Sequence, residues 1–173
     1  MFDLSKIHVP FRMALRPKDR RGLHVPFFQH IPDTFEQDRK VDFRIKNPVN
    51  QYRAIERRLC GLCGQEILRT AFCYFIGTEQ DVKHRVFADP PMHLSCAQYA
   101  MQVCPFLSNP NYIVGSHDIE KTVPEANRTQ GKRPDHMALY KTRTYCRALA
   151  HNGSGVYVQA GDPIEIVWFR GDE

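Results

Sequence analysis

The sequence predicts an α+β fold built around one metal site, and three features of the 173-residue chain support this prediction. A Cys-x2-Cys pair, Cys60 and Cys63, is followed by glycine. A His-x2-Cys pair, His93 and Cys96, lies near the start of a predicted helix. Short apolar segments bounded by turn residues are typical of β-strands. A chain of this length fits one domain with an appended arm.

The composition excludes several classes of protein. Hydrophobic residues make up 42% of the chain and charged residues 25%, so the chain is not disordered throughout. Its longest apolar run is far shorter than the roughly 18 residues of a membrane-spanning helix. The start, Met-Phe-Asp-Leu-Ser-Lys, lacks the basic and apolar regions of a signal peptide. We therefore expect a cytoplasmic protein that does not bind membranes.

The chain divides into three predicted segments. Residues 1–50 contain five prolines and are expected to form an irregular basic arm, whose apolar patch at residues 25–28 anchors on the core. Residues 51–108 carry the predicted zinc module. Residues 109–173 begin with a turn-rich linker and end in a β-hairpin that is expected to pack on the same core.

Positive charge is concentrated in the first third of the chain. The net charge is +5, and residues 1–59 hold 13 Lys and Arg against 7 Asp and Glu. A basic arm beside a nearly neutral domain can bind phosphate groups, which makes nucleic acid a candidate partner. The alternative is an ordinary solvated basic surface. The candidate nucleic-acid contacts are Arg16, Lys18, Arg20 and Arg21.

The six cysteines indicate a metal site rather than disulfides. A chain with no recognisable leader, and long enough to fold without crosslinks, has little need of disulfides. Cys60 and Cys63, with the following Gly64, form the zinc-knuckle pattern Cys-x2-Cys-Gly. Two thiolates at this spacing face one ion if the backbone turns tightly, and glycine accepts the positive φ of such a turn.

A helix is predicted over residues 90–104. Its expected N-cap, first-turn proline and stop signal are Asp89, Pro90 and Pro105. His93 and Cys96 then lie on one helical face near the N-terminus, where the helix dipole favours a thiolate. This geometry places both side chains beside one ion.

Between the two ligand pairs, residues 66–88 are predicted to form a β-hairpin with its turn at residues 77–81. A knuckle, a hairpin and a helix with ligands at its start together make a treble-clef zinc finger. Four protein ligands complete the coordination of the ion, so we expect a structural Zn²⁺. The predicted ligands are Cys60, Cys63, His93 and Cys96.

Three other residues are weaker candidates for the metal. Cys104 lies about 12 Å beyond Cys96 along the predicted helix, too far to share its ion, and is interpreted as a core residue. Cys73 falls within a predicted strand and is expected to pack. His84, on the predicted returning strand, is the alternative fourth ligand.

The last third of the chain is predicted to contribute β-structure. Residues 138–150 are interpreted as a strand or a short helix, and residues 152–155 (Asn-Gly-Ser-Gly) as a turn. Residues 156–159 and 164–169 are predicted to pair as an antiparallel hairpin around the turn at residues 160–163.

Three motifs stand out together: residues 58–64 (Arg-Leu-Cys-Gly-Leu-Cys-Gly), residues 90–97 (Pro-Pro-Met-His-Leu-Ser-Cys-Ala) and residues 104–107 (Cys-Pro-Phe-Leu). They resemble the pattern CxxCG…PPxHxxCAxYA…CPFL of uncharacterised bacterial and bacteriophage small zinc-binding proteins. The resemblance extends over residues 55–171. It implies a cytosolic prokaryotic or phage protein with zinc at the four predicted ligands, and it brings no established activity.

The sequence is compatible with three functions. The first is a zinc-stabilised binding module that acts through a protein partner, because the metal site is closed and the usual nucleotide-binding and hydrolase motifs are missing. The second is nucleic-acid binding through the basic arm. The third is a treble-clef nuclease in which His84 activates water, although no neighbouring His, Asp or Asn completes a catalytic metal site. We assign no catalytic residue, and the enzyme is the less favoured interpretation.

Overall fold

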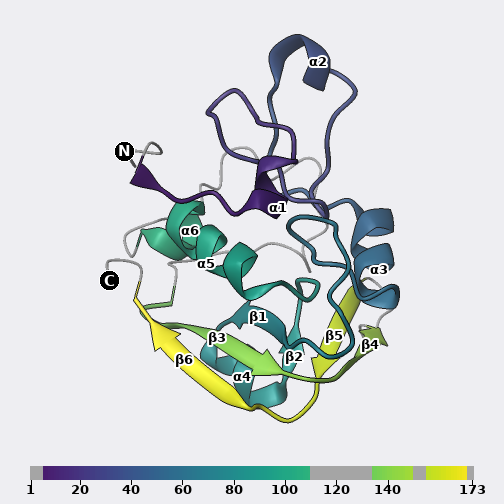
Figure 1. Cartoon of the computed structure of the whole chain (residues 1–173), viewed down its shortest axis with the longest axis vertical. Coiled ribbons are helices and arrows are strands. Elements are labelled where there is room, and N and C mark those ends of the chain that lie inside the picture. Colours follow the sequence, from purple (N-terminus) through teal and green to yellow (C-terminus); the bar gives the residue numbers. More distant parts are fainter. Residues whose placement is uncertain (1–5, 110–133, 150–154, 171–173) are drawn as a thin grey trace.

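The computed structural model describes residues 6–109, 134–149 and 155–170 and is mixed α+β, as predicted (Figure 1). Its helices are α1 (Phe11–Ala14), α2 (Phe35–Asp38), α3 (Pro48–Glu56), α4 (Glu79–His84), α5 (Leu94–Val103) and α6 (Pro105–Ser108). Its strands are β1 (Cys73–Gly77), β2 (Val86–Phe87), β3 (Met137–Thr142), β4 (Tyr145–Leu149), β5 (Val156–Ala160) and β6 (Glu165–Phe169). Most of the predicted linker, and nearly all of the predicted turn at residues 152–155, lie outside the described residues. Within the described ranges, no helix is long and apolar enough to cross a membrane.

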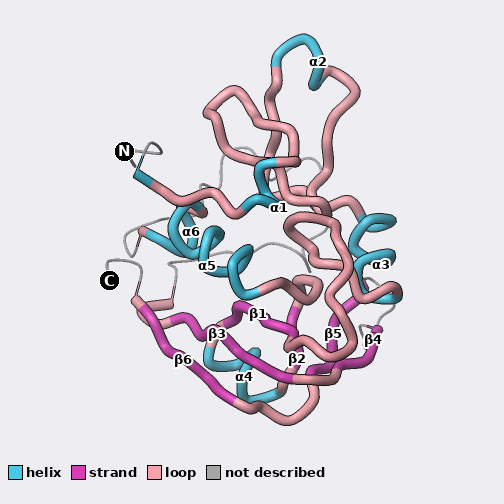
Figure 2. Tube along the Cα trace, viewed as in Figure 1, coloured by secondary structure: helices cyan, strands magenta, loops and turns pink. Residues whose placement is uncertain are grey.

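The strands form two small antiparallel sheets (Figure 2). One sheet has the strand order β1-β3-β6, and the other has the order β2-β5-β4. The region interpreted as a strand or a short helix, residues 138–150, is therefore two strands, β3 and β4, and each belongs to a different sheet.

The predicted hairpin over residues 66–88 is wrong, because β1 and β2 belong to different sheets. The segment interpreted as its turn begins helix α4. The Thr78 hydroxyl accepts from the Asp81 amide, and the Asp81 carboxylate accepts from the Thr78 amide at 2.7 Å. This reciprocal capping box starts a helix. Arg85 ends the helix in the left-handed region, at φ 55°, and β2 then pairs with β5.

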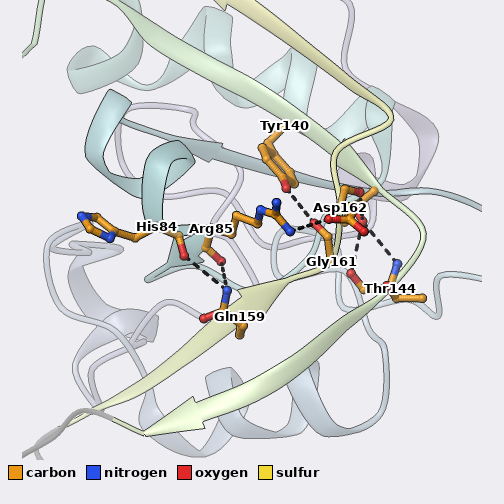
Figure 3. A network of polar contacts seen from close by, with 8 residues as sticks. His84, Arg85, Tyr140, Thr144, Gln159, Gly161 and Asp162 are labelled. Atoms are coloured by element: carbon orange, nitrogen blue, oxygen red, sulfur yellow. Dashed lines mark hydrogen bonds and ion pairs between the residues drawn. The ribbon is translucent and has the colours of Figure 1, made fainter.

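The predicted C-terminal hairpin is also wrong, because β5 and β6 lie in different sheets. Residues 161–164 cross from one sheet to the other, and a network of hydrogen bonds holds this crossing (Figure 3). The Tyr140 hydroxyl donates to the Gly161 carbonyl at 2.6 Å. The Gly161 amide donates to the Thr144 carbonyl at 2.8 Å.

Polar side chains complete the network around the crossing. The Thr142 hydroxyl donates to the Asp162 carbonyl at 2.9 Å, and Arg85 forms an ion pair with the Asp162 carboxylate. The Gln159 side-chain amide lies 3.3 Å from the carbonyl oxygens of both His84 and Arg85. These contacts satisfy backbone groups that have no strand partner where the chain changes sheets.

The two sheets share one hydrophobic core. Phe75 from β1, Phe87 from β2, Tyr140 from β3 and Val158 from β5 are each at most 1% exposed. The ring centroids of Phe75 and Phe87 lie 5.1 Å apart, and so do those of Phe87 and Tyr140. Aromatic pairs at such distances contribute about 0.5–1.5 kcal/mol beyond the burial of their area. The rings therefore join the two sheets into one unit.

The N-terminal arm is largely irregular, as predicted, and it has a small buried cluster of its own, formed by Val25, Phe35 and Val41. The predicted anchor at residues 25–28 is confirmed for Phe28, which belongs to the main core, whereas Val25 belongs to the separate cluster of the arm. The amides of Phe27 and Phe28 donate to the carbonyls of Leu62 and Gly61 at 2.8 and 3.0 Å. The arm is thus attached to the Cys-x2-Cys turn.

We expect Tyr140→Phe to lower the free energy of unfolding by about 1 kcal/mol, because it removes the hydrogen bond to the Gly161 carbonyl and keeps the buried ring. Urea unfolding followed by circular dichroism measures the change. The control is Tyr157→Phe, which alters a half-buried phenol with no hydrogen bond to the described residues. Equal unfolding midpoints for the two variants would contradict a stabilising role of the Tyr140 hydroxyl at the crossing.

Candidate metal centre

Four side chains from two segments of the chain meet in a buried cluster. The ligand atoms of Cys60, Cys63, His93 and Cys96 all lie within 4.8 Å of one another. The three cysteines are buried, and His93 is half-buried. These are the four predicted ligands, and they lie close enough to hold a metal ion.

The first two ligands lie on a tight turn. The Gly64 amide donates to the Cys60 carbonyl at 2.8 Å, and the Cys60 amide donates to the Gln65 carbonyl at 2.8 Å. Gly64 has a φ of +77°, the conformation that the knuckle pattern predicts. A Cβ at this position would lie 2.8 Å from the Phe27 ring. The local backbone and the packed arm both require glycine here.

The second ligand pair lies at the start of α5, but this helix is shorter than predicted. It begins at Leu94 rather than at residue 90, with His93 as its N-cap, and it ends at Val103. Asp89, the expected N-cap, instead forms an ion pair with Lys46 at 2.6 Å. Cys96 remains in the first turn of the helix.

An extended segment before α5 explains the late start of the helix. The amide and carbonyl of Met92 pair with those of Tyr74 in β1 at 2.9 and 3.0 Å. The Gly61 amide donates to the Pro91 carbonyl at 2.8 Å. Because these backbone groups pair with β1 and the Cys-x2-Cys turn, they cannot enter a helix. The same bonds hold the two ligand pairs together.

One ring nitrogen of His93 faces the cluster, and the other is anchored. Nδ1 lies 3.4 Å from the Cys63 Sγ, and Nε2 lies 3.0 Å from the Glu66 carbonyl oxygen. A carbonyl only accepts, so the proton of a neutral His93 belongs on Nε2, which leaves the Nδ1 lone pair for a metal. Partners of this kind orient metal-binding histidines.

The cluster has the dimensions of a tetrahedral site. With metal–sulfur bonds of about 2.3 Å and a metal–nitrogen bond of about 2.0 Å, neighbouring donor atoms lie roughly 3.5–3.8 Å apart. The 3.4 Å between Cys63 Sγ and His93 Nδ1, and the 4.8 Å limit for the whole set, differ little from this spacing. The residues therefore fit one ion bound by three sulfurs and one nitrogen.

The packing of these groups shifts their pKa values in different directions. Burial opposes ionisation of Cys60, but hydrogen bonds with Cys63, Cys96 and His93 hold its pKa well below the ordinary value. Burial also opposes the charge on His93, yet its bonds to Cys60 and Cys63 raise its pKa to about 10. Bonds with the same two cysteines raise the pKa of Cys96. The cluster therefore favours negative charge on Cys60, which attracts a cation.

A positive charge from the arm interacts electrostatically with the cluster. Burial lowers the pKa of Arg16, and the negative charge of Cys63 opposes this shift. The Arg16 Nε donates to the Val25 carbonyl at 2.9 Å, and the guanidinium lies 5.7 Å from the centre of the Phe27 ring. Three thiolates, one imidazole and a divalent ion carry a net charge of −1, which Arg16 is placed to compensate.

The other candidate nucleic-acid contacts have different surroundings. Arg21 forms an ion pair with Asp19 at 2.6 Å, and its guanidinium lies 4.8 Å from the centre of the Phe43 ring. Lys18 and Arg20 are exposed. Contacts within the protein therefore engage Arg16 and Arg21, and part of the basic charge of the arm is structural.

The weaker metal candidates do not join the cluster. Cys73 is fully buried in β1, as predicted, and burial raises the pKa of its thiol to about 11. Cys104 is the C-cap of α5 and is half-buried. His84 is exposed at the end of α4, so the structure does not place it as the fourth ligand.

Comparison with known protein families, curated proteins and solved structures found no match to the chain. The resemblance to bacterial and bacteriophage zinc-binding proteins therefore stays a prediction. The chemistry of the site follows from its own geometry, in which two short segments supply four buried or half-buried donors to one point.

Replacing Cys60 or Cys96 with serine is expected to abolish metal binding and to unfold the centre of the chain, because metal-binding energy at such a site is folding energy. Cys104→Ser is the matched control, expected to keep the metal and to lose only packing stability. Metal analysis by mass spectrometry and far-UV circular dichroism measure the two effects. Loss of the metal from Cys104→Ser would show that the ligand set is wrong.

The cysteines of the folded, metal-loaded protein should react with iodoacetamide in a defined order. Cys146 is exposed and should react first. Cys73 should stay protected near pH 8, because it is buried and its pKa of about 11 leaves little thiolate. Timed labelling followed by peptide mass spectrometry measures both rates. Equal rates at the two positions would contradict the burial of β1.

Proposed function

We propose that this protein is a zinc-stabilised binding module in which Zn²⁺ has a structural role. The observation that carries the proposal is a cluster of four protein donors, three of them buried, at one point. Catalytic zinc sites keep one position open for water or substrate, whereas four protein ligands close the site. The ion then stabilises the fold, and the surface of the module binds the partner.

The donor set favours zinc over other common ions. Three thiolates and one imidazole suit a tetrahedral ion of intermediate softness, whereas Mg²⁺ and Ca²⁺ prefer oxygen ligands. Iron–sulfur clusters are usually held by four cysteines. Zinc also has no redox chemistry of its own, which suits a structural role.

Support for a treble-clef-like arrangement is local. Residues 60–64 form a tight knuckle turn, and the second ligand pair begins α5, so the first and last parts of that motif have counterparts here. The middle part differs, because β1 and β2 pair into different sheets. We therefore propose a variant in which α4 and two separately paired strands replace the usual hairpin.

The nuclease alternative has less support. His84, the hypothetical base, is exposed and lies outside the cluster. The part of the chain that the structure describes holds no second group of three or more His, Cys, Asp or Glu that could bind a metal. A scaffold explains the site more simply than a catalyst. A cytoplasmic, prokaryotic or bacteriophage setting and a protein partner remain part of the proposal.

Metal removal tests the structural role. We expect one zinc ion per chain, and we expect a strong zinc chelator to release the arm, because Phe27 and Phe28 pair with the turn that the ion holds. Release would loosen the backbone of residues 12–21, so that trypsin cleaves after their exposed arginines more rapidly. Limited proteolysis and circular dichroism measure this, with zinc re-addition as the control. Unchanged cleavage and secondary structure after complete zinc loss would contradict the proposal.

A further inference from the structure

We propose that a surface beside the Cys-x2-Cys turn binds the phosphate backbone of nucleic acid. It consists of three exposed arginines, Arg57, Arg69 and Arg143, which we call the arginine surface. The inference rests on the proposed function, because the zinc-bound turn holds this surface in place. It adds nucleic acid to the protein partner of the proposed function, as a second partner with a binding surface of its own.

Two segments that are distant in the sequence meet at Arg58. Its carbonyl accepts from the Ile67 amide at 2.8 Å. Its guanidinium donates to the carbonyls of Ile67 at 3.2 Å, Ala71 at 3.1 Å and Arg143 at 3.2 Å. Arg58 therefore holds both ends of the loop that carries the Cys-x2-Cys turn. The same side chain also holds the connection between β3 and β4.

The three arginines extend from these tied segments. Arg57 is the C-cap of α3, and Arg69 lies in the loop at residues 67–71. Arg143 lies between β3 and β4, and its guanidinium reaches the carbonyl of Thr70, the neighbour of Arg69, at 3.5 Å. The fold therefore joins the backbone segments that carry these three arginines, which come from distant parts of the chain.

Among the described residues, no carboxylate forms an ion pair with these three arginines. Two nearby cations of β3 and β4 are paired instead: Lys141 lies 3.0 Å from Glu165, and Arg147 lies 2.9 Å from Glu56. Glu66 also lies in the loop of the metal turn, and its single negative charge leaves the region positive. Uncompensated arginines on a surface favour an anionic partner.

Cations already cover the aromatic rings next to this surface. The Phe72 ring has Arg143 at 4.4 Å and Lys141 at 4.7 Å from its centre, and the Tyr145 ring has Arg58 at 5.7 Å. A covered ring is a poor platform for a nucleic-acid base, whereas a guanidinium held on a ring keeps N–H groups for phosphate. Binding of nucleic acid should therefore depend on the negative charge of its phosphates and show little preference for base sequence.

Fewer basic side chains of the arm are available for phosphate than the sequence alone indicates. The Arg16 Nε donates to the Val25 carbonyl at 2.9 Å, and Arg21 is paired with Asp19. The arginine surface thus replaces the arm as the favoured phosphate contact, and the two sites can be separated by mutation.

Fluorescence anisotropy of the zinc-loaded protein with labelled mixed-sequence DNA, single-stranded and duplex, over a range of salt concentrations tests the proposal. The test variant combines Arg57→Gln, Arg69→Gln and Arg143→Gln. The control combines Lys18→Gln, Arg20→Gln and Lys40→Gln, which removes the same charge from exposed positions of the arm. Zinc content and melting temperature are measured for each protein, so that a folding defect is separated from lost contacts.

The test variant should make the negative slope of log affinity against log salt shallower, by about two for single strands and nearly three for duplexes. The reason is that each phosphate contact contributes roughly 0.7 or 0.9 to that slope. The control should keep most of the wild-type slope. A loss confined to the control, or equal losses in both variants, would overturn the arginine surface.

Two further outcomes separate this inference from the proposed function. If the wild-type protein holds zinc and is folded but does not bind DNA at low salt, nucleic acid is not a partner, and the structural role of zinc stands. If complete zinc removal changes neither the fold nor DNA binding, the structural role of zinc is wrong, and so is the dependence of the surface on it.

Discussion

The tight turn at residues 60–64 is the constraint on which the rest of the structure depends. The arm pairs with its carbonyls, and the extended segment before α5 accepts from its Gly61 amide. A Cβ on Gly61 would lie 3.0 Å from Pro90, and one on Gly64 would lie 2.8 Å from Phe27, so the neighbours leave no room for larger residues. Two of the four metal-ligand candidates occupy the same turn. The candidate ligands, the arm and the segment before α5 therefore all meet at one short piece of backbone.

The ligand set could be predicted from the sequence because its geometry is local. Cys60 and Cys63 are placed by a turn whose glycine is visible in the sequence, and Cys96 follows His93 by three residues. The partners around the ligands could not be predicted in this way. The Glu66 carbonyl that orients His93 is a backbone group, which any residue type supplies. The electrostatic effect of Cys63 on Arg16 depends on the fold of the arm, which the sequence does not reveal.

Strand pairing was the main failure of prediction, and its cause is physical. Segments that are close in the sequence often pair as hairpins. Here the two strands of each predicted hairpin belong to different sheets. The side chains of Phe75, Phe87 and Tyr140 nevertheless pack into one core that both sheets share. Short apolar segments specify that strands exist, but not which partners they take. Helix α4, in contrast, could have been predicted from the sequence. Thr78 and Asp81 have the spacing of a capping box, which the interpretation of this segment as a turn overlooks.

The distribution of charge follows from the position of the metal centre. If the four candidate ligands hold a divalent ion as three thiolates and one imidazole, the site carries a net charge of −1, and Arg16 of the arm interacts electrostatically with Cys63. Arg58 is engaged by backbone carbonyls, and it ties together the segments that carry its exposed neighbours. The positive charges of the chain thus divide into those engaged by other groups of the protein, as Arg16 and Arg58 are, and those exposed to solvent.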